Sequence, residues 1–229
     1  RRTQVVDSFE TVEIAAEEVQ PDDVRILVTR NGFVKRMQPR LYDKAIAGGE
    51  FTDPPAESFA CLSNTRILFF TDHGNCYPVA ADQIPEARAK DRGLPYGGVL
   101  AGLEKEENVI GVLPAGSYAG EVLLATKLGM IKRTKLEDLN VRKSRFSVIT
   151  LKGDDRLISV LDASSGTDLM LITRQGMAIH FAVDEVSLVG RTAAGVKSMT
   201  LAEGDEIKDA LALVDNGGFD FTKYERNGY

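Results

Sequence analysis

The residues best placed to do chemistry are cations that recur in groups. Lys35-Arg36 and Lys132-Arg133 each follow a short apolar segment, and Arg142, Lys143 and Arg145 come soon after the second pair. Cations of this kind can bind a phosphate backbone, because neutralising a dense line of negative charge releases its counterions. Such contacts position the protein without reading base sequence. We therefore predict a surface that binds the backbone of a nucleic acid.

Groups typical of a catalytic or metal centre are scarce. His73 and His180 have no partner at the spacing that metal ligands need. None of the six tyrosines follows an arginine, and no Gly-x-x-x-x-Gly-Lys-Ser/Thr loop is present to hold nucleotide phosphates. The carboxylates gather in turns and in an acidic flank. We expect no catalytic residue, no metal site and no cofactor in this chain.

The composition is that of an ordinary globular protein. The chain has 229 residues, of which 43% are hydrophobic and 27% charged. No apolar run approaches the roughly 20 residues that cross a bilayer, and no signal peptide is visible, so we expect no membrane partner. Cys61 and Cys76 are too few for a disulfide framework, and we interpret both as small buried hydrophobic residues. A reducing, cytoplasmic location fits these features.

The charge is sorted into blocks, although the formal net charge is −6. Residues 7–23 hold seven acids and no base, whereas residues 24–44 and 127–145 each carry a net charge of +5. Residues 200–220 are acidic again, with six acids against one lysine. Any single block is consistent with a solvated face. Two basic blocks at matching places in a repeat instead favour a binding surface.

A repeat runs through the chain. An apolar segment, a threonine, two variable residues, a glycine and a second short segment recur around Gly32, Gly74, Gly129 and Gly176. The spacings of these glycines are 42, 55 and 47 residues, and a fifth copy begins at residues 226–229. Periods of this size indicate solenoids, propellers or arrays.

Each unit is expected to form four short strands. The apolar segment is typical of a strand buried on both faces, and the glycine supplies the positive φ of a tight hairpin. We expect third strands near residues 98–103, 146–151 and 196–201, and fourth strands near 109–113, 157–161 and 207–213. Helical signal is almost absent; residues 12–19 could form a short helix or a lead-in strand. The prediction is an all-β, propeller-like wheel of four-stranded antiparallel blades.

At this point the sequence resembles a known family. The pattern Thr-x-x-Gly-[aromatic or aliphatic]-x-Lys-Arg is similar to the blade motif in the C-terminal domain of the A subunits of DNA gyrase and topoisomerase IV. Residues 83–88 with 91–95, and residues 189–196, resemble further segments of that family. The resemblance extends from about residue 22 to the end of the chain.

The resemblance implies a β-pinwheel, a propeller-like disc whose neighbouring blades exchange strands and whose outer rim bends duplex DNA. Residues 1–22 would then be an acidic linker from the enzyme core, and residues 23–229 would hold four blades and the start of a fifth. The parent enzyme would be a cytoplasmic, nucleoid-associated bacterial topoisomerase that needs ATP and Mg. It would include a second A subunit together with a B (ATPase) subunit. The acidic stretch could compete with DNA for the rim, or could simply be a solubilising linker.

One departure from the family is informative. Gyrase A subunits carry a Gln-Arg-Arg-Gly-Gly-Lys-Gly box after the second strand of the first blade. Here residues 38–50 retain only Gly48-Gly49, with Asp43 and Glu50 nearby. The missing box favours the A subunit of topoisomerase IV, with a gyrase A domain as the first alternative. A propeller that binds proteins is the alternative from another class.

The expected DNA contacts are the cations at equivalent places in the units. They are Lys35, Arg36, Arg40, Lys44, Arg88, Lys90, Arg92, Lys127, Lys132, Arg133, Lys135, Arg142, Lys143, Arg145, Arg191 and Lys197.

Overall fold

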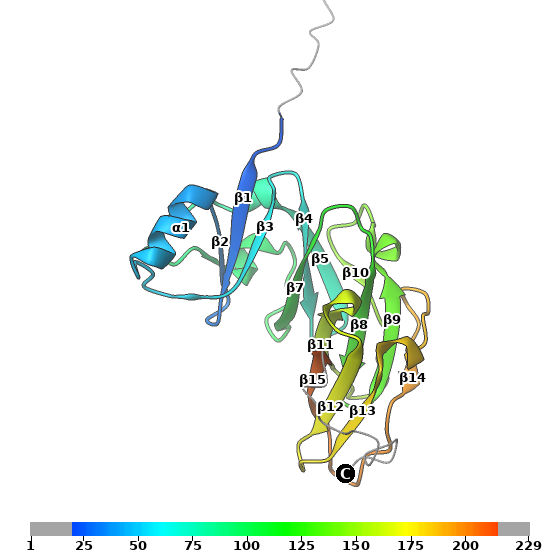
Figure 1. Cartoon of the computed structure of the whole chain (residues 1–229). Coiled ribbons are helices and arrows are strands. Elements are labelled where there is room, and N and C mark those ends of the chain that lie inside the picture. The colour runs from blue at the N-terminus through cyan, green and yellow to red at the C-terminus, as the bar shows by residue number, and fades with distance from the viewer. Residues whose placement is uncertain (1–19, 215–229) are drawn as a thin grey trace, which may run out of the picture.

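The structure is a computed structural model that describes residues 20–214, most of them in four antiparallel sheets (Figure 1). From one edge to the other, sheet A contains β3 (Pro55–Leu62), β1 (Asp23–Thr29), β2 (Phe33–Met37) and β6 (Leu94–Pro95). Sheet B contains β7 (Val109–Ala115), β4 (Arg66–Thr71), β5 (Asn75–Ala80) and β10 (Phe146–Ser147). Sheet C contains β11 (Leu157–Asp162), β8 (Glu121–Thr126), β9 (Met130–Lys135) and β14 (Val196–Lys197). Sheet D contains β15 (Ile207–Leu213), β12 (Asp168–Thr173) and β13 (Ala178–Ala182).

The recurring threonine and glycine build the central hairpin of each sheet. In sheet A, Gly32 has φ +78° and donates its N–H to the carbonyl of Thr29. The buried Thr29 hydroxyl accepts the N–H of Phe33, the residue after the glycine, at 3.3 Å. Thr71, Thr126 and Thr173 accept the equivalent bond at 3.0–3.3 Å. The repeat therefore encodes one hairpin used four times, as predicted.

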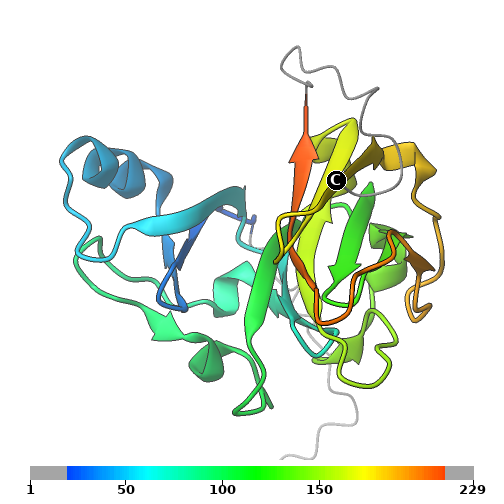
Figure 2. The same ribbon diagram turned by 90° about the horizontal axis from the view of Figure 1, so that it is seen from below.

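The first strands of the second and third units, β4 and β8, are buried on both faces because a sheet packs against each face. In β4, Ile67 and Phe69 face sheet A, whereas Leu68 and Phe70 face sheet C. All four side chains are fully buried. The sheets therefore follow one another in chain order, from β1 to β15 in Figure 1. Figure 2 shows them from below, with the blue and cyan strands of sheet A apart on the left. Packing on both faces explains the unbroken apolar runs in the sequence.

Neighbouring sheets exchange strands. The short strands β6, β10 and β14 pair with β2, β5 and β9, the second strands of the preceding unit. The strands β7, β11 and β15 lie at the opposite edges of sheets B, C and D, where β11 contacts both β7 and β15. We call these the inner edges, and the edges formed by β6, β10 and β14 the outer edges. The exchange agrees with the pinwheel that the resemblance implied. Each exchanged strand has only two residues, shorter than predicted, and β6 lies ahead of the predicted 98–103.

Helix α1 (Pro39–Ala47) departs from the prediction of an almost helix-free fold. Pro39 lies in its first turn, where a missing N–H costs nothing, and Gly49 with φ +60° follows its end. Ala45 packs with Leu27 and Met37, so α1 covers the face of sheet A opposite to sheet B.

The remaining helical turns are short. They are α2 (Tyr96–Val99) and the 3₁₀ turns Ala81–Gln83, Leu136–Leu139, Ala163–Ser165 and Val183–Glu185. Cys76 is buried as expected, but Cys61 is only half-buried. Within residues 20–214, no helix is long and apolar enough to span a bilayer. The acidic stretch up to residue 19, including the expected element at 12–19, and the fifth repeat at 226–229 lie outside the described residues.

Candidate nucleic-acid interface

Three segments each lead into an exchanged outer strand. They are residues 84–93 before β6, residues 140–145 before β10 and residues 187–195 before β14, and we call them the inter-blade loops. Because β6, β10 and β14 are the outer edges of their sheets, the loops lie at these outer edges.

The first and third inter-blade loops are bound to the preceding unit in the same way. The backbone of Arg36 donates to the carbonyl of Pro85 at 2.9 Å and accepts the N–H of Ala87 at 3.0 Å. The backbone of Arg133 makes the equivalent pair of bonds with Ser187 and Val189, at 2.9 and 3.0 Å. These short parallel bridges fix both loops against the second strand of the preceding sheet.

The second inter-blade loop is held differently. Arg66 of β4 donates from Nη1 to the carbonyl of Val141 at 3.1 Å. At the place where the other two units have a lysine, this unit has Tyr77, whose hydroxyl donates to Glu107 at 2.8 Å. Sheet B therefore fastens its loop with a side chain of its first strand.

One arginine of each loop stacks on an aromatic ring. Arg92 lies 5.3 Å from the ring centre of Phe33, Arg145 lies 5.8 Å from that of Tyr77, and Arg191 lies 5.4 Å from that of Phe146. Guanidinium groups gain from this cation–π geometry and lose conformational freedom before any ligand arrives. The loops therefore present partly pre-organised cations.

Two of the predicted DNA contacts are corrected by the structure. Lys35 and Lys132 are 1% and 0% exposed. Their ammonium groups donate to backbone carbonyls and do not reach the surface. The pattern in the sequence placed both at the rim, but a strand whose two faces are both covered has no solvent side for a lysine to occupy.

Other predicted cations are engaged with acids. Arg133 pairs with Glu121 and Asp184 at 3.2 and 3.1 Å. Lys127 pairs with Glu206 at 2.9 Å, and Arg145 with Glu104 at 2.8 Å. Half-buried Arg36 lines a hollow that also contains Asp22, Asp23 and Glu86. These four cations are less available to phosphate than the sequence suggested.

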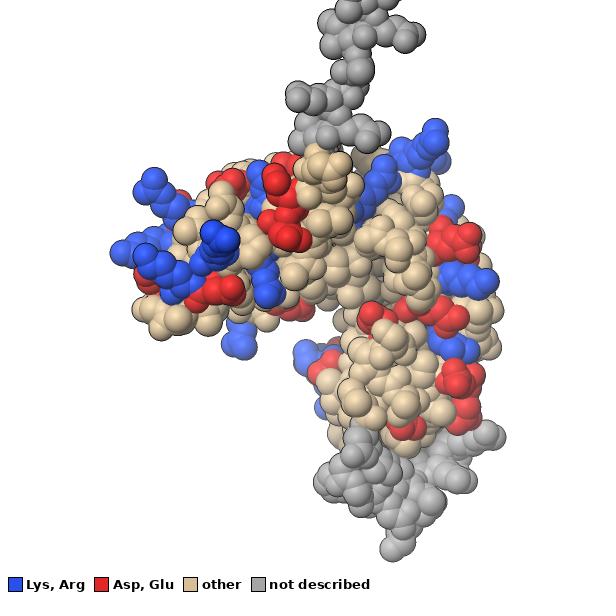
Figure 3. All heavy atoms as spheres, turned by 45° about the horizontal axis from the view of Figure 1, so that its top comes forward, with Lys and Arg blue, Asp and Glu red and all other residues tan. Residues whose placement is uncertain are grey.

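Most of the remaining predicted cations are exposed, and Arg191 is half-exposed on its loop. Figure 3 shows Lys and Arg gathered over the α1 end and further cations along the opposite margin, with acids between them. The exposed ones are Arg40, Lys44, Arg88, Lys90, Arg92, Lys135, Arg142, Lys143 and Lys197.

A buried carboxylate supports the hairpin in three units, a role that sequence reasoning missed. Glu107 accepts hydrogen bonds from Thr71, Asn75 and Tyr77. Asp155 and Asp205 accept backbone N–H groups of the equivalent turns at 2.8 and 3.1 Å. The signal was present in the sequence, because each acid stands two residues before a fourth strand.

Glu107 also lies close to His73 and Glu104, with one candidate ligand atom of each within 4.8 Å of the others. Both carboxylate oxygens of Glu107 already accept hydrogen bonds. Glu104 is paired with Arg145. The carboxylate that would anchor a cation is thus part of the hairpin, and we assign no metal site to the cluster.

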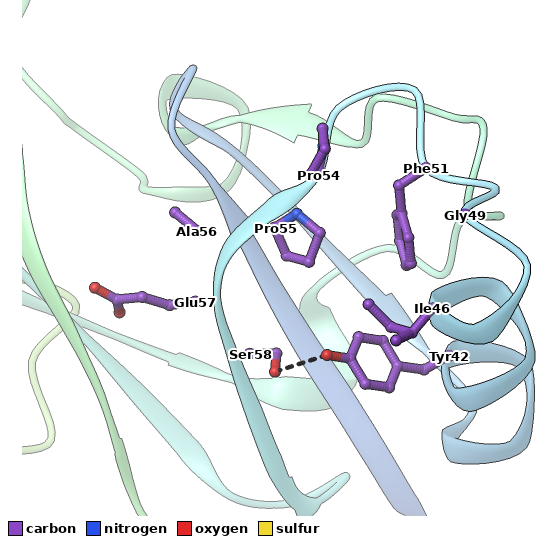
Figure 4. A pocket seen from close by; sticks show the side chains of 9 residues that line it. All are labelled: Tyr42, Ile46, Gly49, Phe51, Pro54, Pro55, Ala56, Glu57 and Ser58. Carbon is purple, nitrogen blue, oxygen red and sulfur yellow. Dashed lines mark hydrogen bonds between the residues drawn. The ribbon is translucent and has the colours of Figure 1, made fainter.

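A shallow pocket between α1 and β3 has a different character (Figure 4). Tyr42, Ile46, Phe51 and Pro55 line it, and the Tyr42 hydroxyl lies 3.1 Å from that of Ser58. No lysine or arginine is among its described lining residues. We therefore do not include it in the basic surface.

Comparison with known proteins identifies the family. The model of the "DNA gyrase C-terminal domain, beta-propeller" family matches residues 26–40, 65–115, 120–164 and 167–213, which is most of the chain. The chain belongs to this DNA gyrase C-terminal domain family. The predicted fold class is thereby confirmed.

The relatives of this chain include A subunits of DNA gyrase and of topoisomerase IV. The chain is 31% identical to the DNA gyrase A subunit of Lawsonia intracellularis and 29% identical to the DNA topoisomerase 4 A subunit of Bacillus subtilis, over 93% and 90% of its own length. It spans only about a quarter of those relatives, 27% and 26%.

Solved members of the family have the same fold. A crystal structure of the C-terminal domain of DNA topoisomerase IV matches with a TM-score of 0.78 and 32% identity, covering 86% of this chain and 63% of that one. The E. coli ParC C-terminal domain matches with a TM-score of 0.65 and 21% identity, covering 82% of this chain and 78% of that one.

Proposed function

We propose that this chain binds duplex DNA along its outer edges without reading base sequence. The observation that carries the proposal is the repetition of basic loops. Three successive inter-blade loops present cations immediately before three outer strands, so the cations are arranged along the outer edges of three successive sheets. A row of cations along neighbouring sheet edges suits the evenly spaced phosphates of a duplex.

The topology also explains how a chain with net charge −6 can bind DNA. The turns before the inner strands β7 and β15, residues 104–108 and 203–206, carry net negative charge, whereas each of the three inter-blade loops before the outer strands carries net positive charge. The net positive charge of these segments therefore lies toward the outer edges of the sheets. The local charge at the outer edge governs binding more than the total does, because charges beyond about 10 Å are screened at 0.1 M salt.

Binding of a short duplex of arbitrary sequence should weaken steeply as salt increases. Each phosphate contact contributes about 0.9 to the slope of log affinity against log salt concentration, so four to six contacts give a slope of about −4 to −5. Fluorescence anisotropy with two unrelated duplexes at several salt concentrations measures both the slope and the sequence preference. Absence of binding at low salt would remove the proposal, and salt-insensitive binding would favour a protein-binding propeller.

We further propose that the parent protein is a topoisomerase IV A subunit, which would act with a second A subunit together with a B (ATPase) subunit, using ATP and Mg. In a gyrase box, three cations on a glycine-rich backbone could press close to phosphate. In this chain the segment contains α1, which is docked through Ala45, and it has Asp43 beside Lys44. Phosphate neutralisation there should be weaker and the DNA wrap only partial.

The expected activity of that parent is relaxation and decatenation with little negative supercoiling. Reconstituted A and B subunits, relaxed plasmid and ATP provide the test, with linked DNA circles as a second substrate. Efficient introduction of negative supercoils would show that the domain belongs to a gyrase.

A further inference from the structure

Two buried lysines occupy the same place in the first and third units. Lys35 of β2 and Lys132 of β9 are the third residues after the hairpin glycine. In the other two units, Tyr77 and Ile179 occupy this place and are also buried. A neutral side chain can therefore fill the position. Burying an ammonium group is costly unless several partners compensate for the lost water, so its presence requires a reason.

The partners of both ammonium groups are carbonyls of the inter-blade loops. Lys35 Nζ donates to the carbonyls of Arg88, Ala89 and Asp91 at 3.1, 3.0 and 2.6 Å. Lys132 Nζ donates to those of Gly190 and Arg191 at 3.2 and 2.6 Å. These bonds span more than 50 residues of sequence. Each lysine thus fastens the loop of the following unit from beneath.

These bonds decide which way the loop faces. Ala89 points inward and packs with Leu27 and Met37, whereas Arg88 and Lys90 on either side of it are exposed. The carbonyl oxygens, which would repel phosphate, are turned toward the ammonium group. The loop therefore shows its cationic side chains to the outside.

The electrostatic surroundings of Lys132 agree with this view. Burial lowers the pKa of Lys132 to about 8, and the neighbouring positive charge of Arg191 contributes to this lowering. A cation fixed beneath another cation is electrostatically unfavourable. This unfavourable placement of Lys132 is explained if the lysine serves to hold the carbonyls of Gly190 and Arg191.

Glycines near the ends of these two loops allow the loops to lie close against the strands that carry the lysines. Gly93 and Gly195 have φ of +89° and +86°, and a Cβ there would lie 2.6 Å from the carbonyl oxygen of Val34 and 2.5 Å from that of Ile131. Neither glycine can be replaced without moving the loop away from the strand that carries the lysine.

We propose that Lys35 and Lys132 are positioning residues, which contact no DNA but hold the first and third inter-blade loops so that their arginines reach phosphate. The proposal rests on the proposed DNA binding. In this proposal the lysine of each Lys-Arg pair is an interior residue, and the inter-blade loop that it holds makes the contacts with DNA.

Lys35→Met and Lys132→Met in the full chain test the proposal, because methionine has a similar length and no charge. Each change should weaken binding of a short duplex about three- to tenfold and reduce the magnitude of the salt slope by about one, as expected when one phosphate contact is lost. Amide hydrogen exchange should accelerate in residues 86–92 for Lys35→Met and in 188–194 for Lys132→Met.

Two controls separate this effect from general ones. Lys152→Met removes the same charge from an exposed turn, and Thr173→Val disturbs a hairpin that binds none of the three inter-blade loops described above; both should leave the salt slope unchanged. Lys132→Met should also have little further effect on binding when Arg191→Ala is already present, because the lysine acts through that arginine.

The outcomes are distinguishable. The proposal would be overturned if folded Lys35→Met and Lys132→Met bound DNA with wild-type affinity and showed wild-type amide hydrogen exchange in the loops. If the wild-type chain does not bind DNA, the proposed function fails, and exchange alone reports whether the lysines hold the loops. If a methionine variant does not fold, Gly195→Ala shifts the loop while keeping Lys132 in place; it should weaken DNA binding similarly, and unchanged binding would contradict the inference.

Discussion

Neutralising five cations of the inter-blade loops should weaken DNA binding by about a hundredfold or more at moderate salt. The changes are Arg88→Gln, Arg92→Gln, Arg142→Gln, Lys143→Gln and Arg191→Gln. Each lost phosphate contact removes about 0.9 from the salt slope, so the losses multiply in affinity. These side chains lie on loops, and none of them belongs to the buried clusters. The variant should therefore keep its fold while its affinity for DNA decreases.

A matched control has the same change in net charge at other exposed cations. It replaces Arg30, Lys105, Lys152, Arg156 and Lys208 with glutamine. This control should retain most of the affinity and most of the salt slope. Equal losses in the two variants would mean that only the overall charge matters and that the loops are not the binding surface.

Glu107→Ala should cost about 3–5 kcal/mol of unfolding free energy. The change removes the acceptor that Thr71, Asn75 and Tyr77 share, and leaves the two hydroxyls only long bonds to backbone carbonyls, at 3.5 Å for Thr71 and 3.3 Å for Tyr77. Each buried polar group left without a partner costs about 1–3 kcal/mol, and the three share one hairpin. Urea unfolding of the variant and of Glu106→Ala, an exposed neighbour, measures the difference. A loss below about 1 kcal/mol would contradict this account.

The effect of Glu107 should also depend on pH. Burial alone would raise the pKa of this carboxyl, but its hydrogen bonds outweigh burial and hold the pKa below the ordinary 4.5. A lowered pKa in the folded state means that the carboxylate stabilises the fold above pH 4.5 and loses this contribution as the pH falls through the folded value. The difference in stability between wild type and Glu107→Ala should therefore shrink in acid, whereas a difference that grows there would have the wrong sign.

The parts of the fold that the sequence predicted are those fixed by local chemistry. The threonine and the glycine of each hairpin interact over four residues, so their spacing alone indicates the turn. The unbroken apolar runs predicted strands covered on both faces, which Ile67 and Leu68 confirm by facing opposite neighbours.

The parts that sequence reasoning missed depend on contacts between distant segments. The place of Lys35 is decided by carbonyls more than 50 residues away, and nothing near it in the sequence distinguishes a buried lysine from a surface one. Helix α1 is a different case, since Pro39 in its first turn and Gly48-Gly49 after its end were readable signals. The sequence identified the cations of the candidate DNA surface, but only the tertiary structure shows which of them are exposed and which are buried.

The exchange of outer strands bears on how the chain folds. Val34 pairs with Leu94, Cys76 with Phe146 and Ile131 with Val196, each between 60 and 70 residues further along the chain. A sheet leaving the ribosome therefore remains one strand short until much of the next unit has been synthesised. Such distant pairings carry a high entropic cost before they gain any contact, which is typical of slow folding. Each of the first three units is completed by a later one, so a break in the chain should damage the sheet before it as well as its own.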